Sequence, residues 1–174
     1  MTSLLRVSGR PVHIGLATLD EAAAISALTT LLAEKFIAHA FSEEGARYLF
    51  RSLTPAAIGN ALASGFRYHI ARNDRQWLGV VGTRDNCHLY HLFVTEPAQG
   101  QGLGRSLWAV AKQACREAGH AGEFTVNASR FAVGFYQKLG FEPQGEEITS
   151  HGVIAVPMRL CERTASPSSR CSVC

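Results

Sequence analysis

The segment that most constrains this chain is QGQGLGRSLW, residues 99–108, in which Gly100, Gly102 and Gly104 alternate with other residues. Glycine is costly inside helices and strands, so this spacing indicates a backbone that turns tightly or approaches something closely. The loop follows the apolar run HLYHLFV (88–94) and precedes a segment with helical periodicity. A strand, a glycine-rich turn and a helix in this order aim several backbone N–H groups at one spot, which predicts an anion site.

Two well-known phosphate-binding loops do not fit this segment. A P-loop requires a Lys directly after its last glycine, and no Lys follows here. The dinucleotide fingerprint GxGxxG is met at Gly100 and Gly102, but Arg105 stands at its third glycine position. The segment is therefore either a phosphate loop of another type or an ordinary surface turn.

The chain has 174 residues, which favours one domain, and its 47% hydrophobic and 18% charged content is typical of a soluble globular protein. Its apolar runs are shorter than the ~18 residues of a membrane span, and its first residues lack the apolar core of a secretory signal. We therefore expect a cytoplasmic protein that binds no membrane. The net charge of +3 is mild and its Lys and Arg residues are scattered, so nucleic acid is not an expected partner.

The five cysteines do not form a recognisable framework, because their number is odd and three of them fall in the last fourteen residues. The end of the chain, 162–174, is polar and Ser-rich and contains a Pro. We predict a disordered tail there, after one domain that spans residues 1–161. The final CSVC loosely resembles a prenylation signal, but nothing else supports lipidation.

Hydrophobic periodicity predicts alternating helices and strands, and hence an α/β chain with a mixed sheet. The three strands that follow residue 65 are short and separated by turn residues, so they should form an antiparallel meander. The last two strands should form a hairpin. The predicted helices lie at 20–36, 42–53, 54–65, 104–118 and 129–139, and the predicted strands at 12–18, 66–72, 77–84, 88–94, 123–127, 141–149 and 152–160.

Three motifs in order resemble the GNAT superfamily of N-acetyltransferases. The pattern Q-x-x-G-x-G (Gln99, Gly102, Gly104) resembles its acyl-CoA loop, and VNAS (126–129) and FYQKLGF (135–141) resemble the strand and helix that follow. The resemblance implies a central mixed, mostly antiparallel sheet of about seven strands flanked by helices. It also implies direct transfer of an acetyl group from acetyl-CoA, without a metal, to a primary amine of a small molecule or peptide.

In that family the loop amides hold the CoA diphosphate, and free N–H groups beside a bulge in the preceding strand hold the pantetheine arm and polarise the thioester carbonyl. Asn127 and Ser129 could contact the arm or cap the next helix, and small residues such as Ala132 and Gly134 would allow a close approach. The residues carried over as CoA-binding are Leu92, Phe93, Val94, Gln99, Gln101, Gly102, Leu103, Gly104, Arg105, Asn127, Ser129, Ala132 and Phe135.

The resemblance places Tyr136 beside the CoA sulfur, where a neutral phenol can donate a proton as the thiolate leaves. Packing in the core is the alternative role for this residue. The candidate bases are His88 and His91, which face opposite sides of a regular strand unless a bulge intervenes. Glu96 and Tyr90 are further candidates, and a water chain without any dedicated base is the remaining option.

The spacing H-x-x-H on a strand does not indicate zinc, because the two rings are separated and no third ligand is apparent. No metal is therefore expected. Cys115 falls on the helix after the loop and is interpreted as packing, so a covalent acetyl-cysteine is not expected.

The acceptor pocket is predicted from the segment KFIAHAFSEE (35–44), in which Phe36, His39 and Phe41 are candidate walls, together with Tyr90. Ordinary core packing is the alternative for each Phe. Rival functions are a non-catalytic CoA-binding or regulatory module, a transferase with another acyl-CoA or an oxygen acceptor, and a nucleic-acid-binding protein. Homodimers are frequent in the family, although no residue here identifies an interface.

Overall fold

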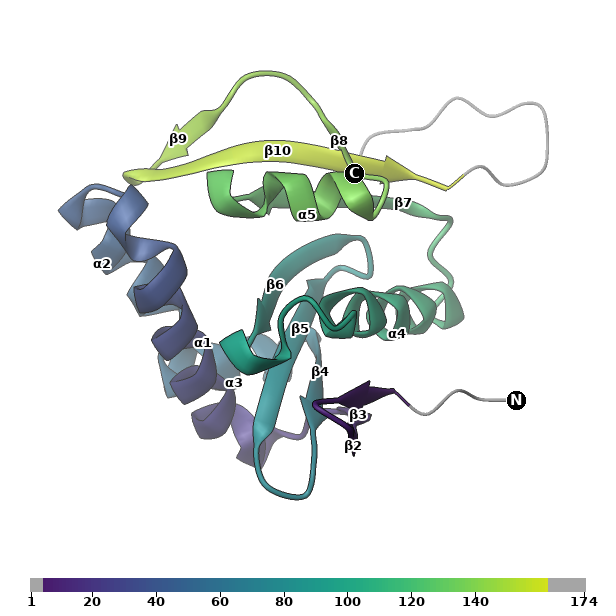
Figure 1. Ribbon diagram of the computed structural model, residues 1–174. Helices are drawn as coiled ribbons and strands as arrows, with labels where there is room; N and C mark the ends of the chain where they lie inside the picture. Colours follow the sequence, from purple (N-terminus) through teal and green to yellow (C-terminus); the bar gives the residue numbers. More distant parts are fainter. Residues whose placement is uncertain (1–4, 163–174) are drawn as a thin grey trace.

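The computed structural model describes residues 5–162, which form a sheet with helices on both faces (Figure 1). Most elements lie where hydrophobic periodicity places them. The helices are α1 (Ala22–Phe36), α2 (Glu43–Ser52), α3 (Pro55–Ala63), α4 (Leu103–Glu117) and α5 (Val133–Lys138), and the strands are β1 (Arg6–Val7), β2 (Arg10–Pro11), β3 (His13–Leu16), β4 (Arg67–Arg72), β5 (Trp77–Arg84), β6 (His88–Val94), β7 (Glu123–Ala128), β8 (Glu142–Pro143), β9 (Ile148–Ser150) and β10 (Val153–Cys161).

The main sheet has the strand order β3-β4-β5-β6-β7-β10-β8, and β9 also pairs with β10. Within the described residues every pairing is antiparallel except that of β6 with β7. The predicted fold class, a mixed and mostly antiparallel sheet flanked by helices, is confirmed. The predicted strand 141–149 is in fact two short strands, and the short β1–β2 hairpin was not predicted.

Helix boundaries follow from capping side chains that the sequence displays. The Ser42 hydroxyl accepts a hydrogen bond from the backbone N–H of Gly45 (3.1 Å) and begins α2. Thr54 does the same for Ala57 (3.2 Å) and begins α3, with Pro55 at the first helical position. These caps satisfy N–H groups that a helix start leaves without intrahelical partners.

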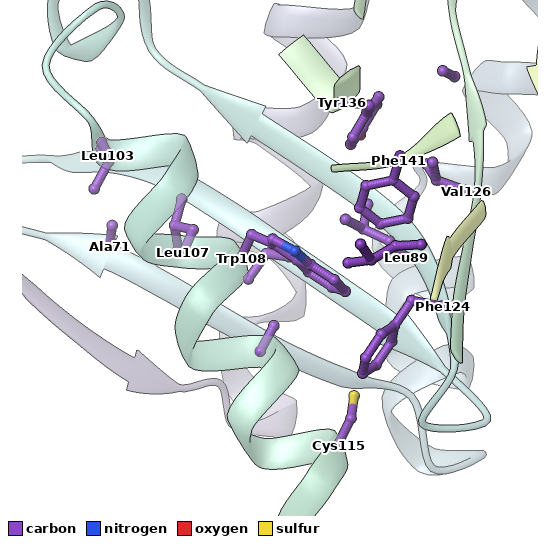
Figure 2. Close-up of a cluster of buried hydrophobic side chains, with 14 of the residues drawn as sticks. Ala71, Leu89, Leu103, Leu107, Trp108, Cys115, Phe124, Val126, Tyr136 and Phe141 are labelled. Atoms are coloured by element: carbon purple, nitrogen blue, oxygen red, sulfur yellow. The ribbon is translucent and has the colours of Figure 1, made fainter. Parts of the chain in front are cut away.

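Two hydrophobic clusters cover the two faces of the sheet. One lies beneath α4 and α5 and is centred on Trp108, whose ring packs edge-on against Phe124 (5.1 Å between centroids) and lies near Phe141 (5.5 Å) (Figure 2). The other lies beneath α1 and α3 and contains Tyr68 and Phe93. With its helices on opposite faces, the sheet is buried from both sides, and sites must open at its edges or where strands part.

The buried face of α4 is formed by Leu103, Leu107, Trp108, Ala111 and Cys115 (Figure 2). Ala118, directly after the helix, is exposed. Cys115 is fully buried among apolar side chains, as its interpretation as packing predicts.

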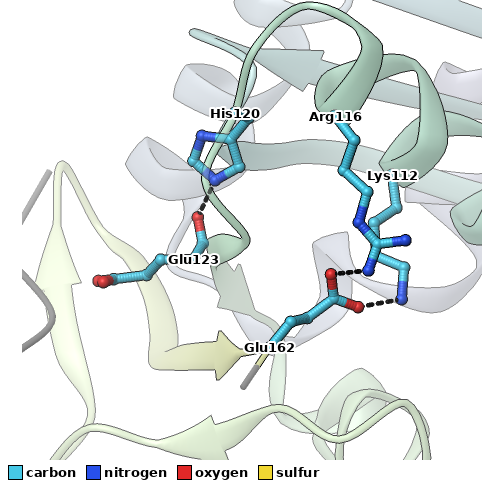
Figure 3. A network of polar contacts seen from close by, with 5 residues as sticks. All are labelled: Lys112, Arg116, His120, Glu123 and Glu162. Atoms are coloured by element: carbon cyan, nitrogen blue, oxygen red, sulfur yellow. Dashed lines mark hydrogen bonds and ion pairs between the residues drawn. The ribbon is translucent and has the colours of Figure 1, made fainter. Parts of the chain in front are cut away.

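The C-terminal end of β10 is tied to α4 by ion pairs of Glu162 with Lys112 (2.5 Å) and Arg116 (Figure 3). Its backbone N–H also donates to the Gly122 carbonyl (2.8 Å). These contacts join Glu162 to the folded part of the chain. The rest of the predicted tail, 163–174, lies outside the described residues.

Strand β6 carries a bulge that sets the orientation of its side chains. Its register with β5 shifts between Gly82, which pairs with His91, and Thr83, which pairs with Leu89, so Tyr90 is the extra residue. Gly82 is required here because a Cβ would lie 2.6 Å from the Tyr68 ring. The Tyr68 hydroxyl in turn lies 3.0 Å from Nδ1 of the buried His91.

We predict that Gly82→Ala destabilises the protein by about 1–3 kcal/mol, because the added methyl must displace a fully buried ring in a close-packed core. The measurement is the free energy of unfolding in urea. Gly134→Ala is the matched control: a Cβ there meets no atom within 4 Å, so the change should be neutral or stabilise α5 by up to ~1 kcal/mol. Equal stability of Gly82→Ala and wild type would contradict this account of the bulge.

Candidate active site

The site begins where β6 and β7 part. The two strands pair only at His88 with Thr125 and at Leu89 with Val126, and beyond these residues they diverge. Residues of β6 after the bulge then face a cavity of about 500 Å³ instead of a neighbouring strand. Its other walls come from the glycine loop, the first turn of α4, the segment from 129 to 139 and the end of α1.

The structure brings most of the predicted site residues together around this cavity. Phe36 and Tyr136 line it together with eleven of the thirteen predicted CoA-binding residues. The predicted residues on its wall are Phe36, Leu92, Phe93, Val94, Gln99, Gly102, Leu103, Gly104, Arg105, Ser129, Ala132, Phe135 and Tyr136. Further lining residues that were not predicted are Leu32, Ile37, Ala98, Gly100, Phe131, Lys138 and Leu139.

The glycine loop leaves several amides open at the start of α4. Gly100 (φ 71°) and Gly102 (φ 82°) adopt left-handed conformations, and Gly102 is the N-cap. The first amide to find an acceptor in the helix is that of Ser106, which donates to the Gly102 carbonyl (3.0 Å). The amides from Leu103 to Arg105 precede it and lack intrahelical acceptors, so they can bind an anion at the positive end of the helix dipole.

Gly104 has a different role from the two preceding glycines. A Cβ at this position would lie 3.0 Å from Cζ of Phe135 and 3.7 Å from a methyl group of Val94. A side chain here would therefore push α5 away from β6 and change the width of the cavity. The absence of a Cβ allows the loop, β6 and α5 to meet at one end of the cavity.

Two glutamines fix the loop from either side. The Gln99 side-chain amide donates to the Val94 carbonyl at the end of β6 (3.0 Å). The Gln101 side chain turns the other way: its amide donates to the Pro97 carbonyl (2.6 Å), and its oxygen accepts from the Ser8 backbone N–H (2.7 Å). Gln101 does not line the cavity, so its side chain anchors the loop to the β1–β2 hairpin.

The charged groups on the cavity wall are all positive. Arg105 lies in the first turn of α4, and Lys138 at the end of α5; no Asp or Glu is among the described lining residues. Together with the open amides they favour a ligand with several negative charges. Lys138 was not predicted as a site residue, although it stands in the FYQKLGF motif and its position there was the available signal.

Tyr136 reaches the cavity from α5 and is buried, with only 6% of its surface exposed. Burial raises its pKa, so the phenol stays protonated at neutral pH. Its ring contacts those of Phe135 (5.4 Å) and Phe141 (5.6 Å), which hold it in place. Its hydroxyl forms no hydrogen bond with another described residue, so its proton is available to a ligand.

Both predicted histidines lie outside the cavity lining. The bulge at Tyr90 turns His88 and His91 to the same face of β6, toward the cluster beneath α1 and α3, whereas a regular strand would have separated them. His88 Nδ1 lies 2.8 Å from the Thr125 hydroxyl. Burial lowers the pKa of His88 to about 4 and that of His91 to about 3, so both are neutral at pH 7.

Three other predicted residues also lie outside the cavity lining. Tyr90 packs edge-on against Phe66 (5.1 Å) on that same face of the sheet. Glu96 is exposed and forms an ion pair with Lys35. Asn127 is exposed on β7 and pairs with Pro157 of β10. None of these three lines the cavity.

His39 and Phe41 line a second, smaller cavity that adjoins the first. It measures about 180 Å³ and shares four wall residues with the main cavity. The shared residues are Phe36, Ile37, Ser129 and Phe131. The predicted acceptor walls on the 35–44 segment are therefore brought next to the cavity that contains Tyr136.

Three histidines in the sheet make the fold sensitive to acid. Burial lowers the pKa of His69, His88 and His91 below the ordinary 6.5, so the unfolded chain binds more protons between that value and their folded pKa values. Stability therefore falls as pH decreases through this range. For His91, with a folded pKa of about 3, the loss between pH 7 and pH 5 is roughly 2 kcal/mol.

We predict that His91→Gln flattens the dependence of unfolding free energy on pH between 7 and 5, because it removes one group that must stay neutral in the fold. Urea unfolding at both pH values provides the measurement. His13→Gln, which removes an exposed histidine of β3, is the control and should keep the wild-type slope. A His91→Gln slope as steep as wild type would show that His91 is not the neutral buried group described here.

Comparison with known proteins agrees with this architecture. Residues 37–161 match the model of the acetyltransferase (GNAT) domain, and the chain belongs to this family of acyltransferases. A GCN5-related N-acetyltransferase from Rhodopseudomonas palustris has a similar structure, with a TM-score of 0.74 and 21% identity over 90% of this chain and 98% of that one.

Two further similar structures were solved with a ligand. PaiA N-acetyltransferase from Thermoplasma acidophilum, in complex with coenzyme A, has a TM-score of 0.69 and 17% identity over 87% of this chain and 99% of its own. YncA from Salmonella typhimurium, with its cofactor acetyl-CoA, has a TM-score of 0.63 and 18% identity over 91% and 99%. At these identities the likeness establishes the shared fold.

Within 5–162, none of the helices is long and apolar enough to cross a membrane. Nor does that part of the chain contain a group of three or more His, Cys, Asp or Glu side chains arranged to hold a metal ion.

Proposed function

We propose that this protein transfers an acetyl group from acetyl-CoA to a primary amine of a small molecule or peptide, by direct attack in a ternary complex. The observation that carries the proposal is the combination of two features in one cavity. Open amides and Arg105 lie at its glycine-loop end, Lys138 also lines it, and the protonated Tyr136 forms part of its wall. A CoA thioester is the ligand class that joins a highly anionic end to a reactive sulfur.

The residues present fit such a ligand. The left-handed Gly102 and the missing Cβ of Gly104 let the main chain close around a diphosphate, and Arg105 in the first turn of α4 adds positive charge there. Lys138 adds a second positive charge to the cavity wall. The apolar wall formed by β6 and Phe135 suits the uncharged pantetheine arm. Similar folds bind CoA and acetyl-CoA in PaiA and YncA, which supports the same use here.

Acetyl-CoA supplies an activated thioester, and the chain supplies position and protons. The edge of β6 that has no strand partner after Leu89 offers backbone N–H groups to the thioester carbonyl near Leu92–Val94. The amine nitrogen forms a bond to the carbonyl carbon while the carbon–sulfur bond breaks. The proton of Tyr136 goes to the departing sulfur, the excess proton of the amine passes to water, and the Tyr136 phenolate regains a proton from water.

No dedicated base is assigned in this mechanism. Among the described residues that line the main cavity, none is Asp, Glu or His. His88 and His91 are held on the other side of β6 by the Thr125 and Tyr68 hydroxyls. Water in the open cavity is therefore the proton acceptor that this geometry favours among the options considered from the sequence.

We predict that Tyr136→Phe lowers kcat by about 10²-fold or more, because the departing sulfur loses its proton donor. CoA affinity should remain within about threefold of wild type, because the loop and the cations are unchanged. Thiol release from acetyl-CoA measures the first quantity, and titration calorimetry with CoA the second. Tyr48→Phe, an exposed residue of α2 outside both cavities, is the matched control.

The possible outcomes separate an enzyme from a binding module. Wild-type turnover with an amine and its loss in Tyr136→Phe support the transferase. CoA binding without thiol release from any amine of a broad panel would instead favour the non-catalytic module. Equal kcat in wild type and Tyr136→Phe would remove Tyr136 from the mechanism.

A further inference from the structure

The second cavity is bounded mostly by apolar and aromatic groups. It lies between the segment after α1, the segment before α5 and the start of β10. Its lining residues are Phe36, Ile37, His39, Ala40, Phe41, Ser129, Arg130, Phe131 and Ile154. Because four of them also line the main cavity, a molecule in the second cavity touches the wall of the cavity that contains Tyr136.

Two rings form the shared wall. Phe36 and Phe131 are stacked, with 5.6 Å between centroids and 13° between planes. Phe131 leaves 68% of its surface exposed, which is unusual for so large an apolar side chain. Exposed aromatic surface beside a cavity is a feature of binding sites, because burial under a ligand recovers the hydrophobic contribution. Phe41 supplies a third ring to the same cavity.

The guanidinium that lines the second cavity is already paired with a carboxylate. Arg130 forms two hydrogen bonds with Glu147, from Nε to Oε1 and from Nη2 to Oε2, each 2.5 Å. Its guanidinium is therefore engaged and does not offer a free receptor for a ligand carboxylate. No Asp or Glu is among the described residues that line the cavity, so a second ammonium group would find no counter-charge.

We infer that the second cavity takes the body of the acceptor, and that the acceptor is a primary monoamine with a flat apolar group such as a phenyl ring. This inference rests on the proposed function and adds the substrate class to it. Apolar cavities of about 150 Å³ hold a benzene ring, so about 180 Å³ is sufficient. The amino group then points past Ser129 on the shared wall, toward the main cavity.

Three amines test the class because each differs from the next in one respect. 2-Phenylethylamine has the ring and one ammonium, phenylalanine adds a carboxylate, and cadaverine replaces the ring with a second ammonium. We expect kcat/KM for 2-phenylethylamine to exceed that of the other two by at least tenfold, measured as thiol release from acetyl-CoA. Comparable or higher values for cadaverine or phenylalanine would overturn the inference while leaving the transferase intact.

Substitutions in the second cavity test whether the preference for 2-phenylethylamine arises there. Phe41→Leu and Phe131→Ala should each lower kcat/KM for 2-phenylethylamine about tenfold, mainly through KM, because ring contacts are lost and the reacting groups are untouched. Phe66→Leu removes a half-buried ring that lines neither of these cavities and is the control. If neither cavity variant changed KM, the acceptor would bind elsewhere and the inference would fail.

Direct binding separates this inference from the proposed function. Titration calorimetry of 2-phenylethylamine into CoA-saturated protein should detect binding that weakens in Phe41→Leu and persists in Phe66→Leu. Such binding without thiol release would uphold the subsite and contradict the transferase. Absence of both binding and turnover with this amine, in protein that binds CoA, would overturn the subsite.

Discussion

The parting of β6 from β7 is the constraint on which the rest of the site depends. The strands share only two residue pairs, and the edge of β6 beyond Leu89 then has no strand partner. Backbone N–H and C=O groups are costly to bury unpaired, so this edge must face water or a ligand. The bulge at Tyr90 bends the strand at the same place and turns two histidines away from the opening.

The main cavity has a positively charged end at the glycine loop and an apolar wall at α1. At the glycine loop it offers open amides and Arg105, and Lys138 of α5 adds a second positive charge to its wall. The residues of α1 that line it, Leu32 and Phe36, are apolar. Tyr136 lies on this wall in a buried setting that keeps its proton on the phenol. An anionic group held at the loop therefore directs an attached uncharged chain along β6 toward a proton donor.

Much of the fold and of the glycine loop was predictable from the sequence, because the features that determine them are local. The tight turn at the glycines, the helix after it and the starts of the helices at 42 and 54 depend on residues a few positions apart, and their placement followed from spacing. The orientation of His88 and His91 did not, because it depends on how β6 registers with β5 across Gly82. The anchoring role of the Gln101 side chain was not predicted either, because its partner Ser8 lies in the β1–β2 hairpin, which hydrophobic periodicity did not indicate. Lys138 was missed although it stands in the FYQKLGF motif, whereas Phe131 reaches the cavity through the packing of the 129–139 segment, which no pattern in the sequence encodes.

The central claim is that the loop and the first turn of α4 hold the diphosphate of CoA. Its most direct test is titration calorimetry of the wild-type protein with CoA and with pantetheine, which shares the thiol arm but lacks the diphosphate and nucleotide. The account predicts saturable one-to-one binding of CoA, weakened by added salt, and binding of pantetheine at least 10²-fold weaker. Equal affinity for the two ligands, or no CoA binding at all, would contradict it.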